Sequence, residues 1–201
     1  MSQRVTRSFR LNVSQENNQL YHASPVQGLT EIVPHISTHG QRWVYATDDR
    51  TVAAIFLGRL GGDFTCASGI YQGKPYLCER FAGAFDRRYG SVVGSIYVLP
   101  ATHFLAGQTS YSKDLVCSQP VAPLEEIKIA SAKGYLLRLA AEDKLVIKFH
   151  PERFCIPDDD EDLVQKAVRI YQRGSSVLEQ VQDFHPHLLG RVQEAIAEEQ
   201  K

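Results

Sequence analysis

Two short runs of the chain place a histidine and a tyrosine at the expected ends of strands. Tyr21-His22-Ala23-Ser24 comes directly before a proline, and Val44-Tyr45-Ala46-Thr47 comes directly before an acidic pair. An imidazole can donate or accept a hydrogen bond, and a tyrosine ring offers an apolar face with a polar edge. Two such side chains at strand ends suit the binding of a small ligand. Single His and Tyr residues are also common in half-buried cores, so a purely structural role stays open.

The four cysteines form no recognisable metal or redox motif. They stand at positions 66, 78, 117 and 155, and none belongs to a Cys-x-x-Cys pair. This spacing argues against a zinc knuckle and against a thioredoxin-like site. The start of the chain carries no apolar signal region, so we expect a cytoplasmic protein with reduced, buried thiols. No stretch reaches the roughly 18 apolar residues of a membrane span, and we expect no membrane contact.

The other histidine groups lack the arrangement of a metal site. His185-Pro186-His187 brings two imidazoles together without a third ligand nearby in the sequence, whereas zinc sites take three or four ligands. His35 and His39 have the i, i+4 spacing of a helical metal pair, but Pro34 and Gly40 predict an exposed loop there. We therefore expect no bound metal.

Two short strands and the helix that follows them must position His22 and Tyr45. In the second strand, Tyr45 points to the face opposite Val44 and Ala46, because successive side chains of a strand alternate. Thr47-Asp48-Asp49 then forms a good N-cap cluster for a helix. The expected elements are a strand over 20–25, a single helical turn or a loop over 28–34, a strand over 43–47 and a helix over 51–60 that ends at Gly61-Gly62.

The middle of the chain has the pattern of strands and its end has the pattern of helices. Aromatic and β-branched runs between turn residues predict strands, and periodic apolar stripes predict helices. Strands are expected over 64–71, 76–81, 92–99, 115–117 and 126–130, and helices over 135–142, 163–172, 176–184 and 187–199. Residues 144–149 fit either a strand or a helix. Because Pro151 and Pro157 bracket the change, the expected units are an arm (1–18), a domain (19–157) and a helical tail (158–201).

The charge of the chain excludes a generic binder of polyanions. Lys+Arg number 22 and Asp+Glu 23, which gives a formal net charge of −1. Nucleic-acid binding would need a local basic patch, and we find only short basic pairs such as Arg87-Arg88. Apolar residues at 43% and charged residues at 22% are typical of a globular domain.

The order of these motifs resembles the ADP-ribosyltransferase fold family, in its diphtheria-toxin-like branch with a His-Tyr-acid triad. Members such as rifampin ADP-ribosyltransferase and the poly-ADP-ribose polymerases open with a strand similar to Tyr21-His22-Ala23-Ser24. Their second strand is similar to Val44-Tyr45-Ala46-Thr47 and runs into a helix. The run Asp114-Leu115-Val116-Cys117-Ser118, followed by Val121-Ala122-Pro123, is similar to the late strand that carries the acid. The resemblance covers about residues 19–130.

The resemblance implies an α+β fold in which a split pair of mostly antiparallel sheets surrounds an NAD cleft, followed by a C-terminal helical tail. It implies an enzyme that transfers ADP-ribose from NAD to an unidentified acceptor, such as a protein, a nucleic-acid end or a small molecule, with release of nicotinamide. His22 would bind a ribose hydroxyl, Tyr45 would stack on the nicotinamide, and Asp114 would stabilise the positive charge that develops on the ribose. The backbone of Ala23 and the hydroxyl of Ser24 would hold the nicotinamide carboxamide.

Two positions depart from the family pattern. Ala23 stands where glycine is usual, and Asp114 stands where glutamate is usual, although rifampin-type members also use aspartate. Glu125 and Glu126 are rival candidates for the acid, because short motifs align loosely. The run Gly58–Gly62 does not match the dinucleotide fingerprint of Rossmann folds. Two further functions stay open, a binding module that has lost catalysis and an enzyme similar to the RNA 2′-phosphotransferases.

Overall fold

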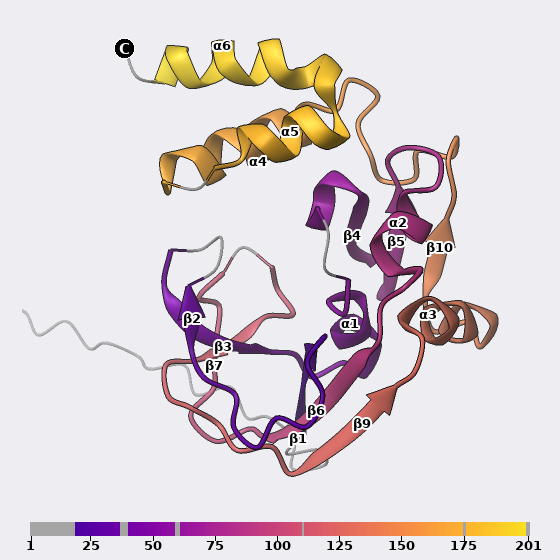
Figure 1. The fold of residues 1–201 in the computed structure, drawn as a ribbon, viewed down its shortest axis with the longest axis vertical. Coiled ribbons are helices and arrows are strands. Elements are labelled where there is room, and N and C mark those ends of the chain that lie inside the picture. The colour runs from indigo at the N-terminus through magenta and orange to yellow at the C-terminus, as the bar shows by residue number, and fades with distance from the viewer. Residues whose placement is uncertain (1–18, 37–39, 59–60, 110, 175, 200–201) are drawn as a thin grey trace, which may run out of the picture.

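The computed structural model describes residues 19–36, 40–58, 61–109, 111–174 and 176–199, so the arm expected over residues 1–18 lies outside the described part. The described chain is a mixed α+β structure with mostly antiparallel sheets and a group of helices at its C-terminal end (Figure 1). The expectation of an α+β class with antiparallel sheets and C-terminal helices is confirmed at this level. None of the helices in the described ranges combines the length and the apolar character that crossing a bilayer needs.

Two sheets face each other and enclose an apolar core. The first consists of β1 (Gln19–Ser24), β6 (Gly94–Pro100) and β9 (Glu125–Ile129), with β6 in the middle. The second has the order β2 (His35–Ile36), β3 (Arg42–Ala46), β8 (Leu115–Cys117) and β7 (Leu105–Ala106). All strand pairs in both sheets are antiparallel. The core between the sheets is made of side chains that alternate along these strands: Leu20, Tyr97, Leu99, Val44, Ala46 and Cys117.

Among the described residues, one pair of backbone hydrogen bonds joins the two sheets. Tyr21 of β1 donates its N–H to the carbonyl of Thr47 at 2.8 Å, and Thr47 donates its N–H to the carbonyl of Tyr21 at 3.0 Å. We call this pair the Tyr21–Thr47 joint. Beyond it β1 and β3 separate, because the only bridge between them among the described residues is this one. Apart from their packed core, the described residues therefore join the two sheets through backbone hydrogen bonds at one point, and the strands part beyond it.

A third sheet and three short helices cover the first sheet. The sheet consists of β4 (Cys66–Tyr71), β5 (Lys74–Glu79) and β10 (Val146–Lys148), and β10 runs parallel to β5. The helices are α1 (Arg50–Ile55), α2 (Ala84–Tyr89) and α3 (Ala132–Ala141). They share a second apolar core with Ile96 of β6 and Ile129 of β9.

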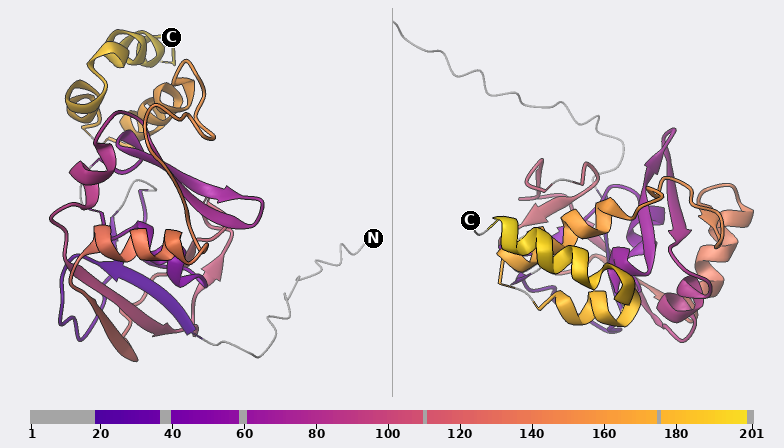
Figure 2. Two further views of the ribbon diagram at one scale, coloured as in Figure 1. Left: turned by 90° about the vertical axis from the view of Figure 1, so that its right-hand side faces the viewer. Right: turned by 90° about the horizontal axis from the view of Figure 1, so that it is seen from above.

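The C-terminal helices form a separate layer at one end of the molecule (Figure 2). This tail consists of α4 (Glu161–Gln172), α5 (Leu178–Phe184), the short 3-10 helix η2 (Pro186–Leu188) and α6 (Leu189–Glu199). Their apolar cluster takes in one residue from the rest of the chain, Phe64 of the 3-10 helix η1 (Gly62–Phe64). One side chain from outside the tail therefore belongs to its apolar cluster.

Several expectations about local structure need correction. Two sheets were expected and three are present, because the runs at 64–71 and 76–81 pair with each other and with β10 instead of joining the main sheets. The helix α2 was not anticipated. Where two alternatives were expected, residues 28–34 form the loop, with one bridge from Ile32 to Val121, and residues 144–149 contain the strand β10.

The helix expected over residues 51–60 ends early, at Ile55. The carbonyl of Ile55 accepts a hydrogen bond from the Tyr89 hydroxyl at 2.8 Å and another from Arg88 at 3.4 Å. Side chains of α2 therefore occupy the position that the next helical N–H would have taken. Gly58 then passes close to α2, and a Cβ there would lie 2.6 Å from the Arg88 side chain.

Candidate functional site

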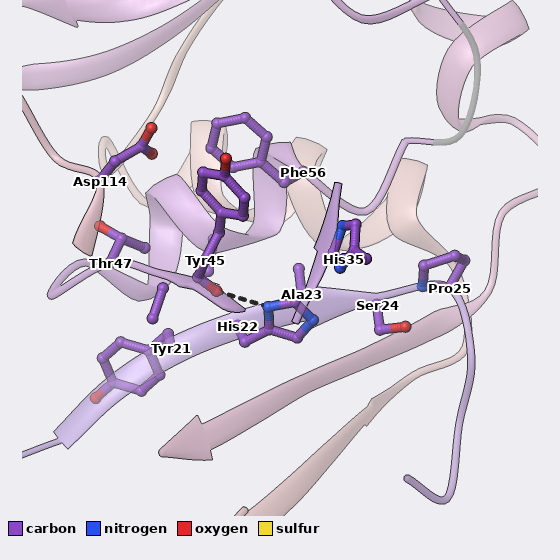
Figure 3. A pocket seen from close by; sticks show the side chains of 12 residues that line it. Tyr21, His22, Ala23, Ser24, Pro25, His35, Tyr45, Thr47, Phe56 and Asp114 are labelled. Atoms are coloured by element: carbon purple, nitrogen blue, oxygen red, sulfur yellow. Dashed lines mark hydrogen bonds between the residues drawn. The ribbon is translucent and has the colours of Figure 1, made fainter. Parts of the chain in front are cut away.

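His22 lies where the two sheets part. In an antiparallel pair the hydrogen-bonded positions alternate, so a ladder continued from the Tyr21–Thr47 joint would next pair Ala23 with Tyr45. Instead the imidazole Nδ1 of His22 lies 2.7 Å from the Tyr45 carbonyl oxygen (Figure 3). The side chain of His22 takes the place of the next ladder bond, and it spans the gap between β1 and β3.

This contact defines the protonation state of the His22 ring. A carbonyl oxygen can only accept, so Nδ1 carries the hydrogen and donates it to Tyr45. Burial lowers the pKa of His22, and the Tyr45 hydrogen bond offsets part of that effect while nearby His35 adds to it. The ring is therefore neutral near pH 7, and its Nε2 is a bare acceptor. The described residues give Nε2 no hydrogen-bond partner.

The backbone of Ala23 faces the same opening. Because the N–H and C=O of Tyr21 point to β3, those of Ala23 point to the same side two residues later. With the Tyr45 carbonyl already taken by His22, neither group of Ala23 meets a strand partner among the described residues on that side. Ala23 thus offers one donor and one acceptor at a fixed spacing. Next to it, the Ser24 hydroxyl accepts a hydrogen bond from the Val26 N–H at 3.1 Å.

Tyr45 projects from the face of the second sheet that points away from the core between the sheets. Val44 and Ala46 are buried in that core, as the alternation predicts, whereas Tyr45 and Trp43 are only half-buried. His35 of β2 is the strand partner of Trp43 of β3, so its side chain lies on the same face. The ring centroids of Trp43 and His35 lie 6.0 Å and 6.3 Å from that of Tyr45. This aromatic surface holds the ring of Tyr45 in place.

Asp114 reaches the same site from β8. Leu115 pairs with Ala46 and Val116 pairs with Tyr45, so Asp114 lies beside Thr47 and projects on the Tyr45 side of the sheet. The Thr109 hydroxyl lies 2.8 Å from the Oδ2 atom of Asp114. Although His22, Tyr45 and Asp114 are far apart in the sequence, three strand ends that meet near the Tyr21–Thr47 joint bring them together.

These side chains line a pocket of about 500 Å³, a size that suits a small-molecule ligand. All five residues assigned to the site from the sequence line it, namely His22, Ala23, Ser24, Tyr45 and Asp114. The other described lining residues are Tyr21, Pro25, His35, Ala46, Thr47, Ala53 and Phe56 (Figure 3). No lysine or arginine is among the lining residues that the structure describes, and Asp114 is their only carboxylate.

The rival acids Glu125 and Glu126 are not among the described residues of the pocket. The Oε1 atom of Glu126 accepts hydrogen bonds from the Ser95 hydroxyl at 2.6 Å, the Gly28 N–H at 2.8 Å and the Tyr97 hydroxyl at 3.2 Å. The Ser95 hydroxyl, followed by the Gly28 N–H, holds the pKa of Glu126 below its usual value. Glu126 therefore fastens the loop after β1 to the first sheet.

Two pocket residues escaped the sequence reasoning. His35 was assigned to an exposed loop, but it lies on β2 and lines the pocket. Phe56 was expected in the middle of a helix, but it follows the last residue of α1. It lines the pocket, and the residue is 47% exposed. Both depend on where an element ends, which the residue pattern did not reveal. His39, the proposed spacing partner of His35, lies outside the described residues.

The remaining candidates of the sequence take structural positions. Cys117 is buried between the two main sheets and faces away from Tyr45. His185 lies within the tail, between α5 and η2. It is buried, and its Nε2 donates to the Phe64 carbonyl at 2.6 Å. Within the described ranges, no three His, Cys, Asp or Glu side chains are placed so that they could hold a metal ion.

Comparison with known proteins gives no relative for this chain: no protein-family model, no curated protein and no solved structure matches it. The interpretation of the site therefore depends on its own geometry.

Proposed function

We propose that this protein is an NAD-dependent ADP-ribosyltransferase with His22, Tyr45 and Asp114 as its site residues. One observation carries the proposal. The three residues that the motif resemblance selects come from β1, from β3 and from the position directly before β8, and all three line one pocket at the point where two antiparallel sheets part. That arrangement also supports an ADP-ribosyltransferase-like architecture for the two main sheets.

The nicotinamide ring, its carboxamide and the attached ribose of NAD have matching partners in the pocket. The bare Nε2 of His22 accepts a hydrogen bond from a ribose hydroxyl, which fixes the dinucleotide along β1. The free N–H and C=O of Ala23 fit a primary carboxamide, which itself carries one acceptor and two donors. This recognition uses backbone atoms alone, so alanine can replace the glycine that is usual in the family. The nicotinamide ring stacks on Tyr45, which Trp43 and His35 support from the side.

The reaction breaks the bond between the nicotinamide nitrogen and the ribose carbon. The bonding electron pair leaves with the nitrogen, so nicotinamide departs as a neutral molecule and positive charge develops on the ribose. The carboxylate of Asp114 stabilises that charge, as carboxylates do in glycoside hydrolysis. The nucleophile of the acceptor forms the new bond to the ribose carbon and loses its proton.

The pocket gives little support to the RNA 2′-phosphotransferase alternative. Such an enzyme must bind a phosphate at the reacting centre, and the described lining residues include no lysine or arginine. Arg88, one half of the basic pair in the sequence, is 3% exposed and donates to the carbonyls of Gly62 and Cys66. It is not available to a nucleic acid.

The test is nicotinamide release from NAD by the purified protein, with NAD binding measured in parallel. Asp114→Asn keeps the shape of the side chain and removes its charge, so we expect release to fall about 100-fold or more while NAD still binds. His22→Ala should weaken binding. Glu125→Gln is the matched control, because Glu125 is an exposed carboxylate outside the described pocket lining, and it should leave both quantities unchanged.

Each outcome decides between the candidate functions. Release that is lost in Asp114→Asn and kept in Glu125→Gln supports the transferase. Binding of NAD without release by the wild type, with a range of acceptors supplied, favours the binding module. If the wild type neither binds NAD nor releases nicotinamide, the proposal fails, and His22 and Tyr45 are structural residues.

A further inference from the structure

We propose that Thr109 is a positioning residue of the reaction: its hydroxyl fixes the orientation of the Asp114 carboxylate without touching the substrate. This inference rests on the proposed function, and it adds a residue that neither the motif resemblance nor the pocket lining identifies. It is carried by the hydrogen bonds of the segment that leads into β8.

The hydrogen of the Thr109 hydroxyl goes to Asp114. The Thr109 oxygen accepts a hydrogen bond from the Tyr111 N–H at 3.2 Å, so its own hydrogen remains for a second partner. Two acceptors are within reach, the Oδ2 atom of Asp114 at 2.8 Å and the Tyr111 carbonyl at 3.2 Å. The carboxylate is closer and charged, and hydrogen bonds to charged acceptors are the stronger ones. The Tyr111 carbonyl in turn accepts the Asp114 N–H at 3.0 Å.

The same segment contacts residues on both sides of α1. Tyr111 meets Phe56 edge to face, with ring centroids 6.3 Å apart. Lys113 pairs with Asp48 at 3.2 Å. These two contacts hold the backbone around Asp114 against the beginning and the end of α1. They do not fix the last torsion of the aspartate side chain, which is broad by nature. The Thr109 hydroxyl, 2.8 Å from Oδ2, constrains that torsion.

A defined carboxylate orientation matters for turnover more than for binding. Asp114 must face the ribose carbon at the moment when positive charge develops there, and a small misplacement of such a group reduces the rate strongly. Thr109 itself is not among the described residues that line the pocket. Loss of its hydroxyl therefore lowers kcat and leaves the affinity for NAD unchanged. It also removes a hydrogen bond that favours the charged carboxylate, so the acidic limb of the pH profile of kcat moves to higher pH.

The experiment compares Thr109→Val, Thr109→Ser and the wild type in nicotinamide release at a series of pH values. Valine has the shape of threonine without the hydroxyl, and serine keeps the hydroxyl. We expect kcat of T109V to fall about 10- to 100-fold, with KM and NAD affinity within about twofold of wild type, and T109S to restore both kcat and the pH profile. Ser112→Ala is the control, since it removes an exposed hydroxyl from the same segment.

The outcomes separate this inference from the proposed function. If the wild type is active and T109V keeps its kcat and pH profile, or if T109S is as impaired as T109V, Thr109 has no positioning role while the function stands. Circular dichroism and thermal melting check the fold of each variant, and Thr109→Ala replaces T109V if that protein does not fold. If the wild type releases no nicotinamide, the proposed function fails and the role of Thr109 falls with it.

Discussion

The pocket and the junction between the tail and the third sheet are both rich in polar groups, but they use them differently. At the junction, Arg80 is almost fully buried, and all three guanidinium nitrogens have partners. They contact the carboxylates of Asp160 and Asp162 and the Asp63 carbonyl. Lys166 then pairs with the Asp63 carboxylate. In the pocket, by contrast, the described residues leave Nε2 of His22 and the backbone of Ala23 without partners.

On the proposed function, the difference separates groups that hold the protein together from groups that bind the ligand. A buried polar group without a partner lowers stability, so a folded chain keeps one mainly where a ligand or water can supply the missing bond. At the junction the guanidinium of Arg80 is satisfied within the protein, so its substitution should change stability alone. The pocket should report on binding and turnover, with little effect on stability. Three predictions test this comparison.

The largest effect is expected at the junction. Arg80→Met removes the buried partner of Asp162 and one of two arginine partners of Asp160, which keeps its pair with Arg153 at 2.6 Å. We expect the free energy of unfolding to fall by about 3 kcal/mol, because breaking a buried pair is costly. Arg191→Met is the matched control: its pair with Glu161 is exposed, so the loss should be about 0.5 kcal/mol. Urea denaturation measures both. Equal losses in the two variants would show that the burial of Arg80 adds nothing.

An intermediate effect, on NAD affinity, is expected at Tyr45, which contributes an aromatic ring and no charge. Tyr45→Ala should weaken NAD binding about tenfold because stacking is lost, and Tyr45→Phe should stay within about twofold. Trp43 is the only tryptophan of the chain and its ring lies beside Tyr45, so its fluorescence can follow the titration. If phenylalanine were as damaging as alanine, the hydroxyl and not the ring face would be the binding group. A loss of stability as large as that of Arg80→Met would contradict the comparison itself.

The smallest effect concerns pH and involves one histidine in each region. Burial lowers the pKa of both His22 and His185. In the pH window that extends downward from ~6.5, the unfolded state therefore binds protons at these histidines while the folded state does not. The free energy of unfolding should therefore decrease as the pH falls through this window, and the contribution is complete above it. The affinity for NAD should decrease at the acidic end of the same window, because protonation of His22 removes the acceptor at Nε2.

His185→Gln separates the two regions in that experiment. Glutamine can still donate to the Phe64 carbonyl, but it does not titrate. The variant should show a weaker dependence of stability on pH and an unchanged dependence of NAD affinity on pH. Thermal melting and NAD titration at pH 5.5 and 7.5 measure the two quantities. A change in the pH dependence of NAD affinity would link the tail to the pocket.

The elements that position the site could be predicted because their signals are local. Alternation along residues 43–47 separates Tyr45 from Val44 and Ala46, and the proline after β1 marks its end. The same holds outside the site: the periodic apolar stripe predicted a helix over 163–172, and α4 begins two residues earlier and ends at the same residue. Such patterns depend only on neighbours in the sequence, so they can be recognised without knowing which distant strand or helix packs against the element.

The features that could not be predicted depend on distant partners. The N-cap of α2 makes no side-chain hydrogen bond, and the helix start is instead satisfied by the carboxylate of Glu79, which accepts the Phe85 N–H at 2.7 Å. The three residues of β10 are all half-buried and show no alternation, and only their parallel pairing with β5 makes them a strand. The hydrogen bond from His22 to the Tyr45 carbonyl is invisible for the same reason, since every residue has a carbonyl.

The Tyr21–Thr47 joint has a consequence for how this molecule can change over time. Both of its hydrogen bonds run between backbone atoms, so neither needs a particular side chain at Tyr21 or Thr47. Ala23 likewise presents its main-chain N–H and C=O to the opening. The two walls can therefore exchange most of their side chains while the angle between them is kept. The shape of the opening thus depends on main-chain atoms, and on the proposed function His22, Tyr45 and Asp114 are the side chains that cannot be exchanged freely.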